Sequence, residues 1–420
     1  MNAQPIRGQW NAEASARGRF ASHPRPTVGV VARCRSYKFL LQPTSRQTVA
    51  LEKLLSLHRE LYNAALEERR GAWQWEKRSV SYFDQSRELT ELGSVRPDTL
   101  AFGVTVCRGT LKRLDRAFQA FFRRCKAGQT PGFPRFKGRG QFDSLQWEDR
   151  NGWTLYEDSK RLRLHGIGHV KVRLHRPIRG TPKTITVRRE GKRFWVSVHC
   201  VDVPAQPLPS TGREVGIDLG VDQLVATSDG QLIENARFAT RGQEALGRAQ
   251  RELSSKTPGS HRRQKAKERV GNHHRKIANQ RRDFAHQVSR QLVNDYDLIV
   301  YEDLKIRNMT RRPKPRPDGE GGCEANRAKA KSGLNRSILD AGWGYLLAMI
   351  RYKAESAGRE VVAVDPRNTS RTCPRCGLVS AGNRCGAVFR CLGCGHSAHA
   401  DINAACNILR AGRARQLQAA

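Results

Sequence analysis

The stretch Val215-Gly216-Ile217-Asp218-Leu219-Gly220 decides the fold, because it is an apolar run that ends on an acid and a glycine. Leu224-Val225-Ala226 follows a short turn, so the two runs predict neighbouring buried strands. Farther along the chain, Leu298-Ile299-Val300-Tyr301 and Val361-Val362-Ala363-Val364 predict two more strands. Helical patterns separate these runs, and such alternation indicates an α/β domain.

Two long helices are expected between these strands. Residues 261–294 begin with nine Lys or Arg between positions 262 and 282 against one acid, and then acquire an apolar stripe at Ile277, Phe284, Val288 and Leu292. We therefore expect one side to face the core and the other to face phosphates. A second helix is expected over residues 334–356 and should end at Gly358. Its apolar face would comprise Leu339, Trp343, Leu346 and Ile350.

Three acids stand at the ends of these elements. Asp218 ends the first strand, Glu302 follows Tyr301, and Asp401 opens a helix in His399-Ala400-Asp401-Ile402-Asn403-Ala404-Ala405. Such acids can converge at one edge of a sheet, where two Mg²⁺ ions about 4 Å apart would neutralise them and support phosphodiester hydrolysis. Their order along the chain matches an RNase H-like fold. The alternative is that each acid is an ordinary turn or capping residue.

Other polar residues nearby are weaker candidates. Asp222, Asp229 and Asp303 lie close to the three acids in sequence. Asp303, however, alternates to the opposite side of the strand from Glu302. His399 could orient water or assist a leaving group, although a single loop histidine is more often structural.

Two cysteine pairs, Cys373-x-x-Cys376 and Cys391-x-x-Cys394, are separated by fourteen residues. Four thiolates at this spacing predict a tetrahedral structural zinc site, a zinc ribbon. The alternative is a chance pairing of free thiols. Gly377 and Gly395 argue against it, because each follows a cysteine pair at a position where the turn needs the backbone freedom of glycine. Three further cysteines, Cys323, Cys385 and Cys406, have no evident partner.

The composition limits the class of protein. Lys and Arg total 76 against 39 Asp and Glu, a formal charge of +37 over 420 residues. Nucleic acid is therefore the expected partner, and the alternative is a basic protein whose charge only keeps it soluble. Eleven cysteines are an odd number and cluster late in the chain, which argues against a disulfide scaffold. No run approaches the ~20 apolar residues needed to cross a membrane, so a cytoplasmic protein of two or three domains is expected.

The N-terminal half combines strands and helices. Ser36-Tyr37-Lys38-Phe39-Leu40-Leu41 predicts a strand, and Thr44 and Gln47 have capping-box spacing for a helix that extends to about residue 78. Residues 111–125 predict another helix. Short antiparallel strands are expected from 127 to about 209, so the helices are inserted into a β domain, and 204–212 resembles a linker. Residues 1–35 predict a disordered basic tail, and 311–331 a surface loop.

These motifs together resemble the TnpB proteins of bacterial insertion sequences, which are relatives of the compact type V CRISPR effectors. The likeness covers about residues 36–410 and includes Tyr37-Lys38-Phe39, Tyr62-Asn63-Ala64-Ala65-Leu66 and Pro134-Arg135-Phe136-Lys137. Its most specific part is the series Gly216-Ile217-Asp218-Leu219-Gly220, Tyr301-Glu302-Asp303-Leu304, Thr369-Ser370-x-x-Cys373-Pro374-x-Cys376-Gly377 and Asp401-Ile402-Asn403-Ala404-Ala405-x-Asn407-Ile408-Leu409.

The resemblance implies a transposon-associated, RNA-guided DNA endonuclease of the metal-dependent RuvC type, with guide RNA and target DNA as partners. It implies a bacterial, cytoplasmic protein that is nucleoid-associated when bound to DNA. By motif, the catalytic residues that would bind Mg²⁺ are Asp218, Glu302 and Asp401. The structural Zn²⁺ ligands would be Cys373, Cys376, Cys391 and Cys394.

The expected architecture is an RNase H-like (RuvC) nuclease domain with an inserted zinc ribbon, preceded by a β-barrel (wedge) domain with a helical recognition insertion. The expected boundaries are 36–46 and 127–209 for the wedge, 47–126 for the insertion, 213–372 and 396–412 for the nuclease, 373–395 for the ribbon, and 413–420 for a C-terminal tail. Alternatives are a guided DNA-binding protein without cleavage, a strand-transferring transposase, and a guide-free nuclease or RNA-binding zinc ribbon. Since all three acids are present, cleavage is expected.

Overall fold

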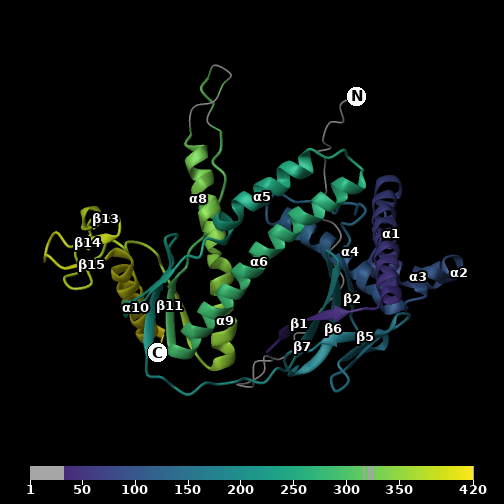
Figure 1. Cartoon of the computed structure of the whole chain (residues 1–420), viewed down its shortest axis with the longest axis horizontal. Helices are drawn as coiled ribbons and strands as arrows, with labels where there is room; N and C mark the ends of the chain where they lie inside the picture. The colour runs from purple at the N-terminus through teal and green to yellow at the C-terminus, as the bar shows by residue number, and fades with distance from the viewer. Residues whose placement is uncertain (1–32, 316, 320–321, 323–325, 420) are drawn as a thin grey trace.

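The computed structural model describes residues 33–315, 317–319, 322 and 326–419. Their strands form sheets of seven, five and three strands. Figure 1 shows the two larger sheets on opposite sides of the molecule. We call residues 33–203 the N-terminal half and residues 213–419 the C-terminal half. Most of the predicted basic tail, residues 1–32, lies outside the described residues, as does part of the predicted loop.

A curled antiparallel sheet forms the base of the N-terminal half, with strand order β2-β6-β7-β1-β5-β4-β3. Strand β1 (Arg35–Gln42) lies in its middle, between β7 and β5, and buries Tyr37, Phe39 and Leu41. The remaining strands are β2 (Ser144–Trp147), β3 (Trp153–Tyr156), β4 (Arg161–Leu164), β5 (Gly168–Arg173), β6 (Thr181–Glu190) and β7 (Arg193–Val201).

Four helices separate β1 from β2 in the sequence: α1 (Ser45–Glu76), α2 (Tyr82–Val95), α3 (Pro97–Leu100) and α4 (Val104–Lys126). The predicted capping box is confirmed, because Thr44 and Gln47 each accept a hydrogen bond from the other's backbone N–H. Helix α4 begins seven residues before the predicted start at 111. Its first turns hold β-branched residues and Gly109, which weaken the helical signal in the sequence. A Cβ at Gly109 would lie 2.2 Å from the carbonyl oxygen of Gln146.

The five-stranded sheet contains all four strands predicted for the C-terminal half, in the order β10-β9-β8-β11-β12. Strands β8, β11 and β12 are parallel, whereas β9 and β10 complete an antiparallel meander from β8. Their bounds are β8 (Glu214–Asp218), β9 (Gln223–Thr227), β10 (Leu232–Glu234), β11 (Leu298–Glu302) and β12 (Glu360–Val364).

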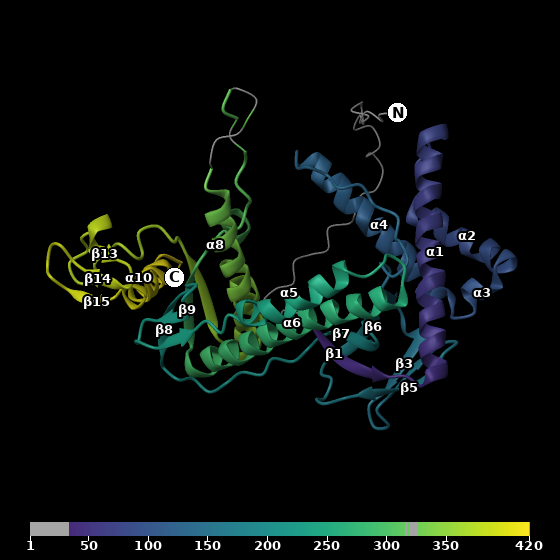
Figure 2. The ribbon, with the colours of Figure 1, turned by 45° about the horizontal axis from the view of Figure 1, so that its top comes forward.

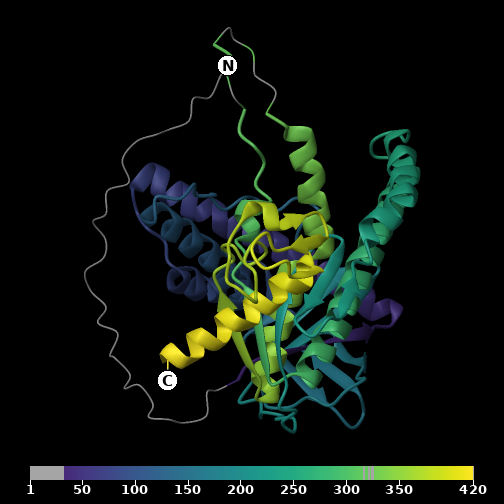
Figure 3. The same ribbon diagram turned by 90° about the vertical axis from the view of Figure 1, so that its left-hand side faces the viewer.

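Helices cover both faces of this sheet. Strand alternation turns Ile217 and Tyr301 toward α6 (His261–Asp295) and α9 (Trp343–Ala357), and turns Val300 toward α10 (Ala400–Ala419). Helix α10 approaches β8 so closely that a Cβ at Gly216 would lie 2.1 Å from the carbonyl oxygen of Ala405. The same helix continues through the expected C-terminal tail to Ala419. Figure 3 shows α10 in front of the sheet.

The helix predicted over residues 334–356 is wrong as a single element. It is divided into α8 (Ala328–Ala341) and α9, because Gly342 adopts a left-handed conformation with φ of 71°. The break leaves Leu339 57% exposed instead of on the shared apolar face. Since α8 begins at Ala328, the predicted loop also ends before residue 331. The predicted end at Gly358 is confirmed by its left-handed C-cap geometry.

The predicted linker, residues 204–212, runs along the lower edge of Figure 1 between the two larger sheets. Its end is fixed to the C-terminal half, because the carboxylate of Asp297 accepts hydrogen bonds from the backbone N–H groups of Thr211 and Gly212. In the part of the chain that the structure describes, every helix is too short or too polar to cross a membrane.

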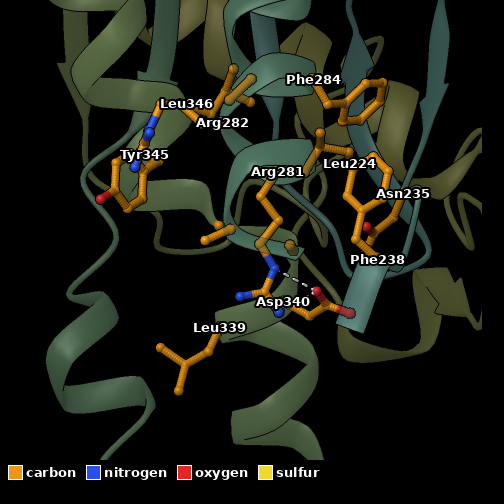
Figure 4. Close-up of a pocket in the computed structure, with 14 residues that line it drawn as sticks. Leu224, Asn235, Phe238, Arg281, Arg282, Phe284, Leu339, Asp340, Tyr345 and Leu346 are labelled. Atoms are coloured by element: carbon orange, nitrogen blue, oxygen red, sulfur yellow. Dashed lines mark hydrogen bonds and ion pairs between the residues drawn. The ribbon is translucent and has the colours of Figure 1, made fainter. Parts of the chain in front are cut away.

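A buried carboxylate joins the helices that cover the sheet. Asp340, at the end of α8, accepts hydrogen bonds from the backbone N–H of Ala239 at 3.0 Å and from Nε of Arg281 at 2.7 Å. It thereby caps α5 (Phe238–Ser254), which has no side-chain cap of its own. Figure 4 shows this ion pair beside a cavity of about 130 Å³ that Leu224, Phe238 and Phe284 help to line.

We expect Asp340→Ala to lower the free energy of unfolding by about 2 kcal/mol, because Arg281 loses its partner and α5 loses its cap. The loss should fall below that of a fully buried pair, since the Arg281 side chain is 33% exposed. Chemical denaturation measures the change. Asp340→Asn, which keeps an acceptor for α5, should lose less; equal losses would contradict the capping role.

Candidate catalytic and metal site

Asp218 and Glu302 lie side by side at the carboxyl ends of parallel strands. Strand β8 pairs with β11 in a register that joins Ile217 to Tyr301, so the two acids come next along both strands. Alternation places both side chains on the face that α10 covers, because Gly216 and Val300 point that way. Asp303, one residue farther on, forms an ion pair with Lys305 instead.

Asp401 comes to the same place from α10. It lies in the first turn of that helix, which packs across β8. The three acids are near enough that both Glu302 and Asp401 act electrostatically on Asp218. A separate group of four cysteines brings its ligand atoms within 4.8 Å of one another.

Burial and like charge both disfavour the ionised form of Asp218. Desolvation, followed by the charges of Glu302 and Asp401, raises its pKa from the usual 3.8 to about 7. Burial also raises the pKa of Glu302, against a hydrogen bond of 2.6 Å that the Thr369 hydroxyl donates to it. In the protein alone, this edge of the sheet therefore holds carboxylates whose negative charge lacks full compensation.

Four cysteines form a second centre, in turns beside a small sheet made of β13 (Arg384–Cys385), β14 (Val388–Arg390) and β15 (Ser397–His399). The Sγ atoms of Cys373 and Cys394 are 3.6 Å apart, and those of Cys376 and Cys391 are 3.5 Å apart. These separations approach the ~3.8 Å edge of a tetrahedron with zinc–sulfur bonds of about 2.3 Å. The cluster could hold a zinc ion.

Backbone groups prepare these thiols to bind a cation. Gly377 and Gly395 have positive φ angles of 77° and 71°, and each donates its N–H to the carbonyl of the first cysteine of its pair. The N–H of Cys394 points at the Sγ of Cys391 and, together with that of Gly393, lowers the pKa of this thiol to about 6. Cys385 is exposed and lies outside the cluster.

Residues 369–395, which we call the cysteine segment, also contact the acids. The side chains that make these contacts were not singled out from the sequence. Arg384 donates from Nη2 to Oδ1 of Asp401 at 2.8 Å, with the Asp401 side chain only 19% exposed. Thr369, which holds Glu302, is fixed in turn by the amide of Asn407, at 2.8 Å from its carbonyl oxygen. Asn403 and Asn407, the later polar residues of the Asp401 motif, thus hydrogen-bond α10 to the cysteine segment.

The weaker candidates have other partners. Asp222 pairs with Arg237, and Asp229 accepts a hydrogen bond from the Tyr296 hydroxyl. His399 accepts, through Nδ1, a hydrogen bond from the backbone N–H of Asp401 at 3.3 Å, a structural contact at the start of α10.

Comparison with known proteins identifies the family. The chain is 33% identical over 385 residues to "Putative RNA-guided DNA endonuclease InsQ" of Escherichia coli K12, covering 91% of this chain and 93% of that protein. It is 33% identical over 388 residues to "Putative RNA-guided DNA endonuclease" of Streptomyces pristinaespiralis, covering 90% of each. The chain belongs to the TnpB/IS605 family.

Family descriptions also match parts of this TnpB-family chain. Residues 198–312 match OrfB_IS605, described as "Probable transposase", and residues 343–408 match the "Cas12f1-like, TNB domain". Residues 34–78 match a "Helix-turn-helix domain" of the same family, although this segment contains strand β1 followed by the single long helix α1.

A solved structure has a similar fold. It is a Cas12f1–sgRNA–target DNA complex whose protein aligns over 90% of this chain and 98% of its own, with a TM-score of 0.52 at 13% identity. A Cas12f1 sequence from Sulfoacidibacillus thermotolerans is 32% identical over 229 residues, or 51% of this chain and 50% of its own. The TnpB-family chain thus has a fold similar to that of this Cas12f1 protein.

The raised pKa of Asp218 predicts a pH-dependent stability of the protein without bound Mg²⁺. Between pH 4 and 7 the folded chain holds a proton on Asp218 that the unfolded chain has lost, so this group's contribution to the free energy of unfolding falls as pH rises through that window. Asp218→Asn removes the contribution. The variant should therefore gain stability relative to wild type from pH 5 to pH 8.

Chemical unfolding without added Mg²⁺ at both pH values measures this difference. Asp222→Asn is the control, because its carboxylate is 88% exposed and should leave the difference unchanged. A gap between wild type and Asp218→Asn that stays constant with pH would contradict the burial of an uncompensated carboxyl group.

Proposed function

We propose that this chain is an RNA-guided DNA endonuclease that hydrolyses phosphodiester bonds with divalent metal held by Asp218, Glu302 and Asp401. The observation that carries the proposal is the meeting of three acids from β8, β11 and α10 at one sheet edge, where Asp218 is buried against two like charges. Two relatives, aligned over 93% and 90% of their own length, carry this activity in their names.

The donor set fits the proposed ions. Carboxylate oxygens are the ligands that Mg²⁺ prefers, and a pair of ions about 4 Å apart needs acids on both sides rather than around one point. Three acids that come from two adjacent strands and a helix suit that arrangement. Bound Mg²⁺ would lower the pKa of the attacking water and stabilise the leaving oxygen.

The chain's own side chains have distinct tasks in this proposal. Thr369 holds one oxygen of Glu302, so the other can face a metal ion. Arg384 orients Asp401 and carries positive charge to the site where a DNA phosphate would lie. Asp218 must lose its proton to bind metal, so metal affinity should rise toward neutral pH.

We further assign the five-stranded sheet and its helices to an RNase H-like (RuvC) nuclease domain, and residues 373–395 to a zinc ribbon inserted in it. The curled sheet would be the wedge domain, with residues 47–126 as a recognition insertion, and these parts would bind the guide RNA and the DNA beside the target. The order β10-β9-β8-β11-β12, with an antiparallel meander beside parallel strands, supports the nuclease assignment.

A guided cleavage assay tests this proposal. RNA that co-purifies with the chain is sequenced, and DNA matching it is incubated with the complex and Mg²⁺. We expect Asp218→Ala and Glu302→Gln to lower the cleavage rate by at least about 10³-fold, because metal binding is lost, while RNA binding persists. Asp303→Ala, the matched control beside Glu302, should cut normally since its carboxylate pairs with Lys305.

Cleavage by Asp218→Ala at the wild-type rate would refute the metal assignment. Guided binding without cutting by wild type would favour a DNA-binding role. Joined DNA products would favour strand transfer, and RNA-independent cutting would favour a guide-free nuclease.

A zinc measurement tests the ribbon. We expect one tightly held Zn²⁺ per chain and its loss in Cys376→Ala, together with cleavage, because Arg384 and Thr369 lie on the segment that the metal would fix. Cys385→Ala, which removes an exposed thiol of the same segment, should retain both zinc and activity. Chelation that leaves folding and cleavage intact would rule out a structural metal.

A further inference from the structure

The turn that follows Asp218 is held by side chains from two other parts of the chain. Residues 219–222 connect β8 to β9, and Asp218 is the last residue of β8, where it pairs with Ala226 of β9. Figure 2 shows β8 and β9 side by side, next to α10. Because the turn begins at one of the three acids, a movement of its backbone would also move the carboxylate of Asp218.

The first backbone N–H of this turn acts on the carboxylate. Burial and the charges of Glu302 and Asp401 raise the pKa of Asp218, whereas the N–H of Leu219 lowers it. This N–H therefore lies close enough to favour the charged form, which is the form that binds metal. Leu219 is buried with the residues that pack the sheet against α6 and α9.

Gly220 gives the turn freedom that some contact must restrict. A Cβ at this position would lie 2.6 Å from the carbonyl oxygen of Gln223, so the close return of the chain requires glycine. Glycine has the widest choice of backbone angles, and rotation at Gly220 would shift Leu219 relative to the carboxylate. A hydrogen bond that fixes the Gly220 carbonyl group would limit this rotation.

Trp343 makes that hydrogen bond from α9. Its indole Nε1 donates to the carbonyl oxygen of Gly220 at 3.0 Å. The tryptophan is only 4% exposed and packs in the apolar core of the C-terminal half. It is the first residue of α9, directly after the left-handed Gly342. Packing thus fixes the ring, and the ring holds the turn.

Asn235 holds the same turn from the end of β10. Its backbone N–H donates to the carbonyl oxygen of Asp222 at 3.2 Å, and its amide Nδ2 donates to that of Val221 at 2.8 Å. The amide oxygen accepts a hydrogen bond of 3.1 Å from the backbone N–H of Arg237, which orients the side chain. Together with Gly220, three successive carbonyl groups of the turn are therefore bound.

We propose that Trp343 and Asn235 are positioning residues for Asp218, which orient its carboxylate toward metal by fixing the turn behind it. The inference rests on the proposed function for the role of Asp218. Loss of hydrogen bonds behind a metal ligand typically costs ~10–100-fold in metal affinity or activity. The sequence did not indicate these roles, because Trp343 belongs to the apolar stripe of its helix and Asn235 follows a short strand.

Removal of the indole N–H tests the role of Trp343. Trp343→Phe keeps an aromatic ring in the core but leaves the Gly220 carbonyl group without its donor. In the guided cleavage assay, we expect the Mg²⁺ concentration at half-maximal rate to rise ~10-fold, while binding of RNA and DNA is unchanged. Tyr345→Phe is the matched control, since this aromatic residue lies two positions along α9 and is 63% exposed.

Hydrogen exchange without added Mg²⁺ gives a second measurement, which does not depend on cleavage. The backbone amides of residues 219–222 should exchange ~10-fold faster in Trp343→Phe than in wild type, because a restraint on the turn is lost. Strand β11 should exchange as in wild type, which separates a local effect on the turn from a general loss of stability.

Asn235→Asp tests the second contact without changing the core. The carboxylate still accepts from Arg237 but cannot donate to Val221, so the Mg²⁺ requirement should rise here as well. Gln231→Glu is the matched control, because it adds the same charge at an exposed side chain four residues away. If Trp343→Phe failed to fold, Asn235→Asp would still decide the question.

An unchanged Mg²⁺ requirement in these variants, or equal effects in the two controls, would overturn the proposal. A fall in rate that is the same at every Mg²⁺ concentration, or exchange that rises equally in β11, would show a merely structural role and overturn it too. Failure of the proposed function would look different, since Asp218→Ala would then cut at the wild-type rate.

Discussion

Repulsion among three carboxylates at one edge of a sheet is the constraint on which the C-terminal half depends. Parallel pairing of β8 and β11 sets Asp218 beside Glu302, and the close approach of α10 at Gly216 brings Asp401 to them. Burial makes the charge more costly, as the raised pKa of Asp218 records. The fold tolerates this cost, and such a trade of stability for function is common at functional sites.

The cysteine segment is coupled to this edge rather than appended to it. Arg384 offsets the charge of Asp401, Thr369 holds Glu302, and the amide of Asn407 secures Thr369. A metal ion among the four thiols would therefore stiffen the surroundings of the acids as well as its own turns. This explains why the cysteines and the last acid lie so near each other in the chain.

The cations of this protein fall into two groups, those paired with acids inside the fold and those without such a partner. Some cations are matched inside the fold, as Arg281 is by Asp340, and these stabilise helix junctions. Others, such as Arg139 and Lys267, face open space between the halves without a partner among the described residues. A bound polyanion would stabilise a chain of charge +37, because it offsets the repulsion among the cations.

Local pattern alone predicted four of the five strands of the five-stranded sheet, the Thr44 cap and the four-cysteine group, and it singled out the three acids, because apolar periodicity, capping and ligand spacing act over a few residues. It did not reveal the break at Gly342, because the apolar period continues across this glycine and predicts one helix. The left-handed conformation of Gly342 is seen only in the structure. Only tertiary structure joined Arg384 to Asp401, Thr369 to Glu302 and Trp343 to Gly220. Such contacts depend on how whole elements pack, which no short stretch of sequence encodes.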